Sequence, residues 1–484
     1  MEESGKPNYP PLPAGAATSC HVVAMPYPGR GHVNPMMNLC KLLASKSPAA
    51  ADIRILVTFV VTEEWHGLIR YEPRPDNIRI RTLPDVIPSE VGRGKDPVGF
   101  LDAVNTALRA PFELLLDDIA TVDQPVAAIV ADAFLTWPPE VGNARGIPVA
   151  SLWTMSAAVL SVFHHSEILR RRQNLPLELL SADHEQAATS AMVDYIPGVS
   201  PTRVADLPTI FFGEHGRTLL PRALNCISSA QTKAQYILFT SFYELEPTTF
   251  DALRSAIPLP IYTVGPAIPF HQLQSSSQND VVEPDYIEWL SSQPAGSVLY
   301  VSMGSFLPLS AAQSDEIAAG IRMSGVRFLW VSRGGETGGG GDLMGNGMVV
   351  RWCDQLRVLT HPAVGAFWTH CGWNSTMEAV YAGVPVLSFP IFWDQVPNSK
   401  AVAEDWGIGW RVKEESGGGG GGGMVKRERV AELVRRFMDG ENDDVKGMKE
   451  RARELRIKCC AAVAEGGSSD KNLDSFIVDV MGGR

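Results

Sequence analysis

Short runs of apolar, β-branched residues alternate with segments of helical periodicity along the whole chain. The runs that predict strands are 21–24, 53–62, 127–131, 149–152, 236–240, 261–264, 298–302, 328–331, 366–368 and 386–389. Such alternation is typical of parallel sheets whose strands are joined by crossover helices. The pattern therefore predicts an α/β fold.

A polar stretch rich in Ser, Gln and Asn, residues 269–285, interrupts this alternation. A chain of 484 residues with 45% hydrophobic content is also too long for a single core. We therefore expect one domain at 1–258 and a second at 259–465, with a linker near 269–285. About the first 18 residues are expected to be a flexible terminus.

Three further segments of the second half indicate local structure. Residues 468–483 place Leu473, Phe476, Ile477 and Val480 at helical spacing, which predicts a helix. Two glycine tracts, 338–341 and 417–423, predict surface loops, because successive glycines hold neither a helix nor a strand at low cost.

Charge and cysteine content exclude several classes of protein. The net charge of -12 argues against nucleic acid or an anionic membrane as the main partner. The seven cysteines form no CxxC pair, so neither a disulfide framework nor a zinc site is indicated. The N-terminus is polar and Pro-rich, unlike a secretory signal, and no apolar run approaches the ~18 residues of a membrane span. We expect a cytoplasmic protein without membrane insertion.

The segment 352–395 holds the most specific chemistry. A strand at 365–369 leads through a polar turn into a helix, and a second strand begins at Pro385. A helix start offers unpaired N–H groups and partial positive charge, so it binds phosphate. His370, Asn374 and Ser375 add side-chain donors at the same place.

The flanks of this segment supply groups for the rest of a nucleotide sugar. Trp352 offers a flat face for a base, and Gln355 and Glu378 can bond sugar hydroxyls. Asp394 and Gln395 follow a buried strand, where ligands of parallel sheets bind. The order is base, ribose, pyrophosphate and sugar.

Two of these residues have a purely structural alternative. Ser375 and Glu378 have the spacing of a capping box, in which the glutamate only stabilises the helix start. For Trp352 the alternative is a core aromatic.

A histidine and an aspartate end strands of the first half. His32 follows strand 21–24 in the sequence PYPGRGHVNP, whose Pro35 favours a helix start. Asp132 ends strand 127–131. Capping of the turn by His32 and of a helix by Asp132 are the structural alternatives. A dinucleotide fingerprint fails, because Asn34 stands at its third glycine.

The segment 352–395 resembles the signature box of plant small-molecule UDP-sugar glycosyltransferases, inverting enzymes that glycosylate secondary metabolites and hormones. The matching features are HCGWNS, a glutamate three residues after the serine, GVP, and a terminal DQ. Asp354 stands where most members have proline. The resemblance implies the GT-B fold: two Rossmann-like parallel-sheet domains that face each other across a cleft. It also implies that the last helix, in 466–484, returns to the first domain.

The resemblance assigns roles to residues of both halves. It implies His32 as general base with Asp132 as its partner, and UDP-glucose as donor, since Gln395 resembles members that use glucose. The remaining donor contacts that it implies are Thr154, Ser305, Trp352, Cys353 through its backbone, Gln355, His370, Trp373, Asn374, Ser375, Glu378 and Asp394. No metal cofactor is expected.

The predicted activity is transfer of glucose to a hydroxyl of a small lipophilic acceptor, such as a flavonoid or other phenolic, a terpenoid or a hormone. The product would be a β-glucoside, made by a monomer. The alternative is a catalytically silent UDP-sugar binding protein. His32 and Asp132 argue against silence, because binding needs neither.

Overall fold

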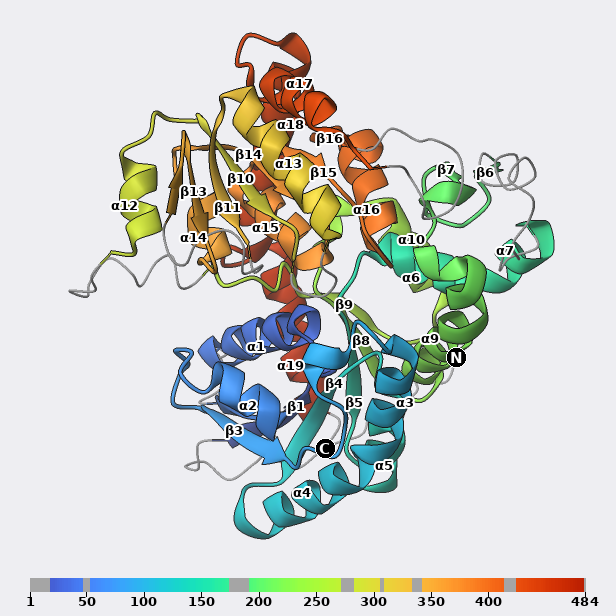
Figure 1. Cartoon of the computed structure of the whole chain (residues 1–484). Helices are drawn as coiled ribbons and strands as arrows, with labels where there is room; N and C mark the ends of the chain where they lie inside the picture. The colour runs from blue at the N-terminus through green and yellow to red at the C-terminus, as the bar shows by residue number, and fades with distance from the viewer. Residues whose placement is uncertain are drawn as a thin grey trace.

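In the computed structural model the chain forms two lobes, each built around a seven-stranded sheet (Figure 1). The structure describes residues 18–46, 53–173, 191–270, 283–304, 309–332, 342–412 and 424–482. The first 17 residues, Ser305, both glycine tracts and most of the predicted linker lie outside these ranges.

The first sheet has the order β3-β2-β1-β4-β5-β8-β9, and all its neighbouring strands are parallel. Its strands are β1 (Thr18–Met25), β2 (Ile53–Thr62), β3 (Ile78–Leu83), β4 (Val126–Asp132), β5 (Val149–Trp153), β8 (Tyr236–Phe239) and β9 (Ile261–Thr263). A separate antiparallel pair consists of β6 (Met192–Val193) and β7 (Thr202–Arg203).

The second sheet has the order β12-β13-β11-β10-β14-β15-β16, in which only β12 is antiparallel to its neighbour. Its strands are β10 (Val298–Ser302), β11 (Arg327–Val331), β12 (Asp342–Met344), β13 (Gly347–Val350), β14 (Val364–Thr369), β15 (Val386–Ser388) and β16 (Gly409–Arg411). The predicted α/β fold of two parallel-sheet lobes is confirmed.

Crossover helices cover both sheets. Those of the first lobe are α1 (Arg30–Ser45), α2 (Glu63–Ile69), α3 (Pro97–Ala107), α4 (Arg109–Val122), α5 (Pro138–Ala144), α6 (Ala157–His164), α7 (Ser166–Gln173), α9 (Gly213–Thr232) and α10 (Pro247–Ala256). Those that follow are α12 (Asp285–Ser291), α13 (Ala311–Ser324), α14 (Gln355–Leu359), α15 (Trp373–Ala382), α16 (Gln395–Lys400), the π-helical turn η5 (Ala401–Asp405), α17 (Arg427–Met438), α18 (Asp443–Val463) and α19 (Ser468–Gly482).

The boundary predicted at residue 258 falls one strand too early. Strand β9 pairs with β8 and so belongs to the first sheet. The sequence pattern could not show this, because a short apolar strand can form the edge of either sheet. Helix α19 also packs on the first lobe, where Leu473, Phe476 and Ile477 share an apolar cluster with residues of β1 (Figure 1).

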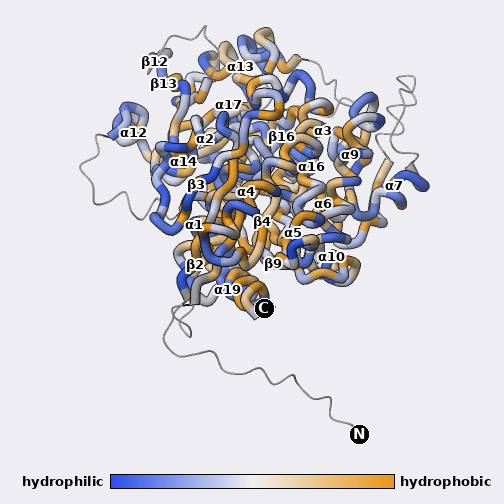
Figure 2. The backbone as a smooth tube through the Cα atoms, turned by 90° about the horizontal axis from the view of Figure 1, so that it is seen from below, coloured by the Kyte–Doolittle hydropathy of each residue, from blue (hydrophilic) through white to orange (hydrophobic). Residues whose placement is uncertain are grey.

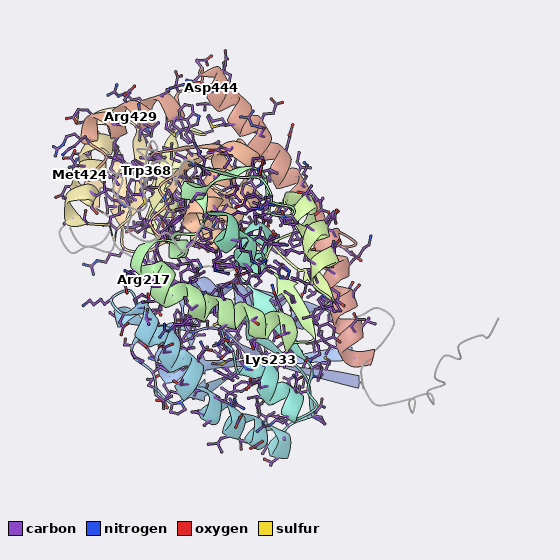
Figure 3. All side chains as sticks on the ribbon, turned by 90° about the vertical axis from the view of Figure 1, so that its right-hand side faces the viewer. Arg217, Lys233, Trp368, Met424, Arg429 and Asp444 are labelled. Atoms are coloured by element: carbon purple, nitrogen blue, oxygen red, sulfur yellow. The ribbon has the colours of Figure 1, made fainter. Side chains whose placement is uncertain are left out.

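Apolar side chains fill the space on both faces of each sheet, which is what two buried parallel sheets require. Figure 2 shows hydrophobic colour along the central strands and α19, whereas α7 and α12 are mostly hydrophilic. In Figure 3, Trp368 of β14 lies within its lobe, and Arg429 and Asp444 lie at the outer end. The carboxyl ends of the strands border the space between the lobes.

Candidate functional site

A cavity of about 660 Å³ lies between the two lobes. One wall comes from the turn between β1 and α1, and the opposite wall comes from α14 and the start of α15. All predicted site residues that the structure describes line it, apart from Asp132, which is buried behind His32.

His32 and Asp132 lie in direct contact. The distance from His32 Nδ1 to Asp132 Oδ2 is 2.8 Å, and the His32 side chain is 22% exposed while that of Asp132 is fully buried. The other carboxylate oxygen accepts the backbone N–H of Phe134 at 2.9 Å. With both oxygens engaged, the carboxylate fixes the imidazole so that Nδ1 faces the protein and Nε2 is the nitrogen available to a ligand.

Thr154 completes this contact. Its Oγ1 lies 3.2 Å from His32 Nδ1. The resemblance assigned Thr154 to the sugar, whereas its hydroxyl here lies against the histidine.

The start of α15 suits an anion. Its N-cap is Gly372, which supplies no side-chain cap, and the first turn has no acidic residue. The helix N–H groups therefore have electrostatic character that favours a phosphate. Asn374 Nδ2 donates to the carbonyl of Gly31 at 3.0 Å, which brings this helix start next to His32 from the other lobe.

The capping-box alternative for Ser375 and Glu378 is wrong. The helix begins at Trp373, so Ser375 lies inside it, and Gln355 Nε2 donates to both Ser375 Oγ at 2.9 Å and Glu378 Oε2 at 2.5 Å. Tyr300 in turn donates to Gln355 Oε1 at 3.2 Å. These bonds hold the polar side chains in place beside the cavity.

Burial changes the charge of this network. It raises the pKa of Glu378 to about 7, an effect that the bond from Gln355 partly offsets. Near neutral pH Glu378 therefore exists in both protonation states, and it can donate as well as accept a hydrogen bond.

The two tryptophans of the segment have opposite environments. Trp352 is 64% exposed at the cavity, so the core alternative for it is wrong. Trp373 is 4% exposed and its ring packs in the core of the second lobe. A contact between Trp373 and a donor would therefore use the backbone at the helix start.

Asp394 and Gln395 lie at the start of α16. Burial raises the pKa of Asp394 to about 6, while Asn398 Nδ2, which donates to Asp394 Oδ2 at 2.8 Å, opposes this rise. Gln395 Oε1 accepts the N–H groups of Ile391 and Phe392 at 2.8 and 3.0 Å. A bond from Gln395 to a sugar would thus come from its Nε2.

His370 and Cys353 are shielded. Burial lowers the pKa of His370 to about 4, so this imidazole is neutral at physiological pH. The thiol of Cys353 is buried against the Tyr300 hydroxyl at 3.3 Å, which leaves its backbone facing the cavity.

Sequence reasoning missed the apolar part of the site. Tyr27, Leu101, Phe134, Met155, Leu219 and Trp393 also line the cavity, and the rings of Tyr27 and Phe134 lie 5.1 and 5.9 Å from that of His32. They come from six separate segments, and each looks like an ordinary core residue. Closeness in sequence to a predicted site residue was a local signal for Tyr27, Phe134, Met155 and Trp393, but not for Leu101 and Leu219.

Two further features of the described residues concern metal ligands and membrane spans. Within these ranges no group of three or more His, Cys, Asp and Glu side chains could hold a metal ion. Across the same ranges, no helix has the length and apolarity needed to cross a bilayer.

Solved structures share this arrangement. The Medicago truncatula protein UGT71G1, complexed with UDP-glucose, matches with a TM-score of 0.75 at 26% identity over 96% of this chain and 98% of that one. Os79 from O. sativa, in complex with U2F and trichothecene, gives 0.77 at 29% identity over 95% of this chain and 100% of that one. The fold and the cavity between its lobes define the class of GT-B glycosyltransferases.

Related sequences identify the family within this class. The family model described as UDP-glucoronosyl and UDP-glucosyl transferase matches residues 265–415. UDP-glycosyltransferase 87A2 of Arabidopsis thaliana is 50% identical over 460 residues, which cover 94% of this chain and 96% of the relative. The chain belongs to the plant UDP-glycosyltransferases.

Proposed function

We propose that this glycosyltransferase moves glucose from UDP-glucose to a hydroxyl of a small lipophilic acceptor, with inversion to a β-glucoside. The observation that carries the proposal is the contact of His32 with Asp132 in the same cavity as the uncapped start of α15. Binding of a UDP-sugar alone requires no base.

In the proposed reaction, His32 Nε2 takes the proton of the acceptor hydroxyl. The oxygen attacks the anomeric carbon on the face opposite UDP, and the bond from that carbon to the diphosphate oxygen breaks. Asp132 stabilises the imidazolium, and the α15 N-terminus stabilises the negative charge on the departing UDP. Residues of the chain thus supply both charges that the reaction needs.

The donor site would be formed by the second lobe and the acceptor site by the first. Trp352 would stack on the uracil, Gln355 and Glu378 would bond the ribose, and Asp394 and Gln395 would bond the sugar. The bound UDP-glucose of the related Medicago truncatula protein supports glucose as donor.

The apolar lining near His32 supports a lipophilic acceptor, because aromatic and aliphatic walls gain free energy by covering an apolar ligand. A phenolic acceptor fits this chemistry. We also propose a monomer in the cytoplasm, a compartment that the seven free cysteines support.

The test is a transfer assay with UDP-glucose, UDP-galactose and UDP-glucuronic acid against a panel of phenols, terpenoid alcohols and hormones, read by mass spectrometry. The proposal expects a β-glucoside from UDP-glucose, with the anomeric configuration read by NMR. Tight UDP binding without product from any acceptor would instead support the silent binding protein.

A further inference from the structure

The loop before Asp394 has an unusual backbone. Trp393 has a φ of 61°, in the left-handed region that a bulky side chain rarely adopts. Such a conformation persists only where surrounding contacts hold it. The next residue in the chain is Asp394, one of the proposed sugar contacts.

The contacts that hold Trp393 come from the other lobe. Its N–H donates to Thr209 Oγ1 at 2.8 Å, and its carbonyl accepts the N–H of Thr209 at 3.1 Å. One residue of the first lobe therefore engages both backbone polar groups of the strained residue.

Side-chain packing follows the same direction. The Trp393 ring lies 5.7 Å from that of Phe134, whose ring lies 5.9 Å from His32. Phe392 belongs to the apolar cluster of the first lobe and lies 5.1 Å from His215 of α9. This loop of the second lobe is thus embedded in the first.

The segment that carries Thr209 is itself fastened to the second lobe. Arg203 pairs with Glu404 at 2.6 Å, and Asp206 pairs with Arg411 at 2.7 Å. Asp206 is buried, so little solvent screens its pair. The ion pairs keep Thr209 within reach of Trp393.

We propose that Thr209 is a positioning residue that places Asp394 and Gln395 against the sugar of the donor, so that the first lobe completes the sugar site of the second. The inference rests on the proposed function and deepens it. Substitution of Thr209 should therefore weaken binding of the sugar but not of the nucleotide. The proposed nucleotide contacts, Trp352, Gln355 and Glu378, lie on other elements.

The test compares Thr209→Val, Thr209→Ser and the control Thr249→Val. Valine keeps the shape and the backbone N–H but removes the hydroxyl, and serine restores it. Thr249 is a buried threonine of the same lobe that does not line the cavity and whose hydroxyl donates to the carbonyl of Gly198 at 2.6 Å.

In Thr209→Val, the ratio of the Kd for UDP-glucose to the Kd for UDP should rise about tenfold, with kcat/KM for UDP-glucose reduced by a similar factor. The Kd for UDP should stay near that of the wild type. Thr209→Ser and Thr249→Val should keep the wild-type ratio.

Two results would overturn the inference: an unchanged ratio in Thr209→Val, or an equal loss of UDP and UDP-glucose affinity. Calorimetry measures both constants without turnover. A wild-type protein that forms no glucoside would therefore refute the proposed function, while the ratio would still decide the role of Thr209.

Discussion

The starts of helices α1 and α15 are built alike but have different surroundings. Each follows a parallel strand inside its sheet, and each helix has a glycine N-cap without a side-chain cap or an acidic first turn. A histidine lies close to each helix start: His32 in the first turn of α1, and His370 two residues before the N-cap of α15. The two helix starts meet through the bond from Asn374 to Gly31.

The surroundings separate the two histidines. His32 is partly exposed and bound to Asp132, which suits it to accept a proton. His370 is likewise partly exposed at the cavity, but its Nδ1 lies 3.3 Å from the Thr369 hydroxyl, and a Cβ atom at Gly304, whose φ is 77°, would lie 2.5 Å from its ring. Similar local motifs thus place a carboxylate-bound imidazole in one lobe, and in the other a neutral imidazole beside a helix start that suits an anion.

The strongest way to break this comparison is His32→Ala. Loss of a general base should lower kcat at least ~100-fold. The Kd for UDP should stay near the wild-type value, because the nucleotide contacts lie in the other lobe. Steady-state kinetics and calorimetry measure the two quantities. His66→Ala, in α2 outside the cavity, is the control, and turnover near wild type in His32→Ala would remove His32 from its role.

Trp352→Ala should act on the donor side instead. Stacking on a base contributes ~1–3 kcal/mol, so the Kd for UDP should rise about tenfold or more. Trp352→Phe keeps an aromatic face and should retain most of the affinity. Equal UDP affinity in Trp352→Ala and the wild type would contradict the stacking role.

The pH dependence of sugar recognition should follow Asp394. Burial raises its pKa to about 6, so the carboxylate takes up a proton as the pH falls through that value. Bonds to a charged acceptor are stronger, and UDP-glucose affinity relative to UDP should fall about fivefold from pH 7.5 to pH 5. In Asp394→Asn the affinity for UDP-glucose relative to that for UDP should be low and independent of pH. A pH-dependent ratio in the variant would assign the effect to another group.

The smallest expected effect is that of Glu378→Gln on thermal stability. The pKa of Glu378 is raised from 4.5 to about 7, so the folded state favours its neutral form. The stability that this neutral form contributes is complete below pH 4.5 and is lost as the pH rises through 7. Glutamine stays neutral, so the Tm of the variant relative to wild type should increase by about 1–3 °C from pH 4.5 to pH 7.5. A constant difference between the two thermal melts would contradict the raised pKa.

The strand pattern predicted most of the fold because buried parallel strands are long apolar runs. Ten runs matched strands of the two sheets. Strand β3 was missed because it lies at the edge of its sheet, where only its two end residues are buried, so it forms no apolar run. Strands β12, β13 and β16 were also missed, because each begins with aspartate or glycine and so offers only a short apolar run.

Among the site residues, the sequence could name those at strand ends and in the signature box, because spacing along one segment fixes their neighbours. It could not settle Glu378, since a capping box and a bond to Gln355 have the same local sequence. It could not find Thr209, which reaches the site from a position distant along the chain.

By itself the sequence determined the two parallel sheets and a helix start suited to phosphate, and its resemblance to a known family supplied the pairing of His32 with Asp132. The sheets and the helix start follow from periodicity and from groups close together along the chain. Only the tertiary structure decided which imidazole contacts a carboxylate, which carboxyls are desolvated, and that the first lobe holds the backbone of Trp393. Burial and contacts between lobes set these properties, and both arise only when distant segments pack together.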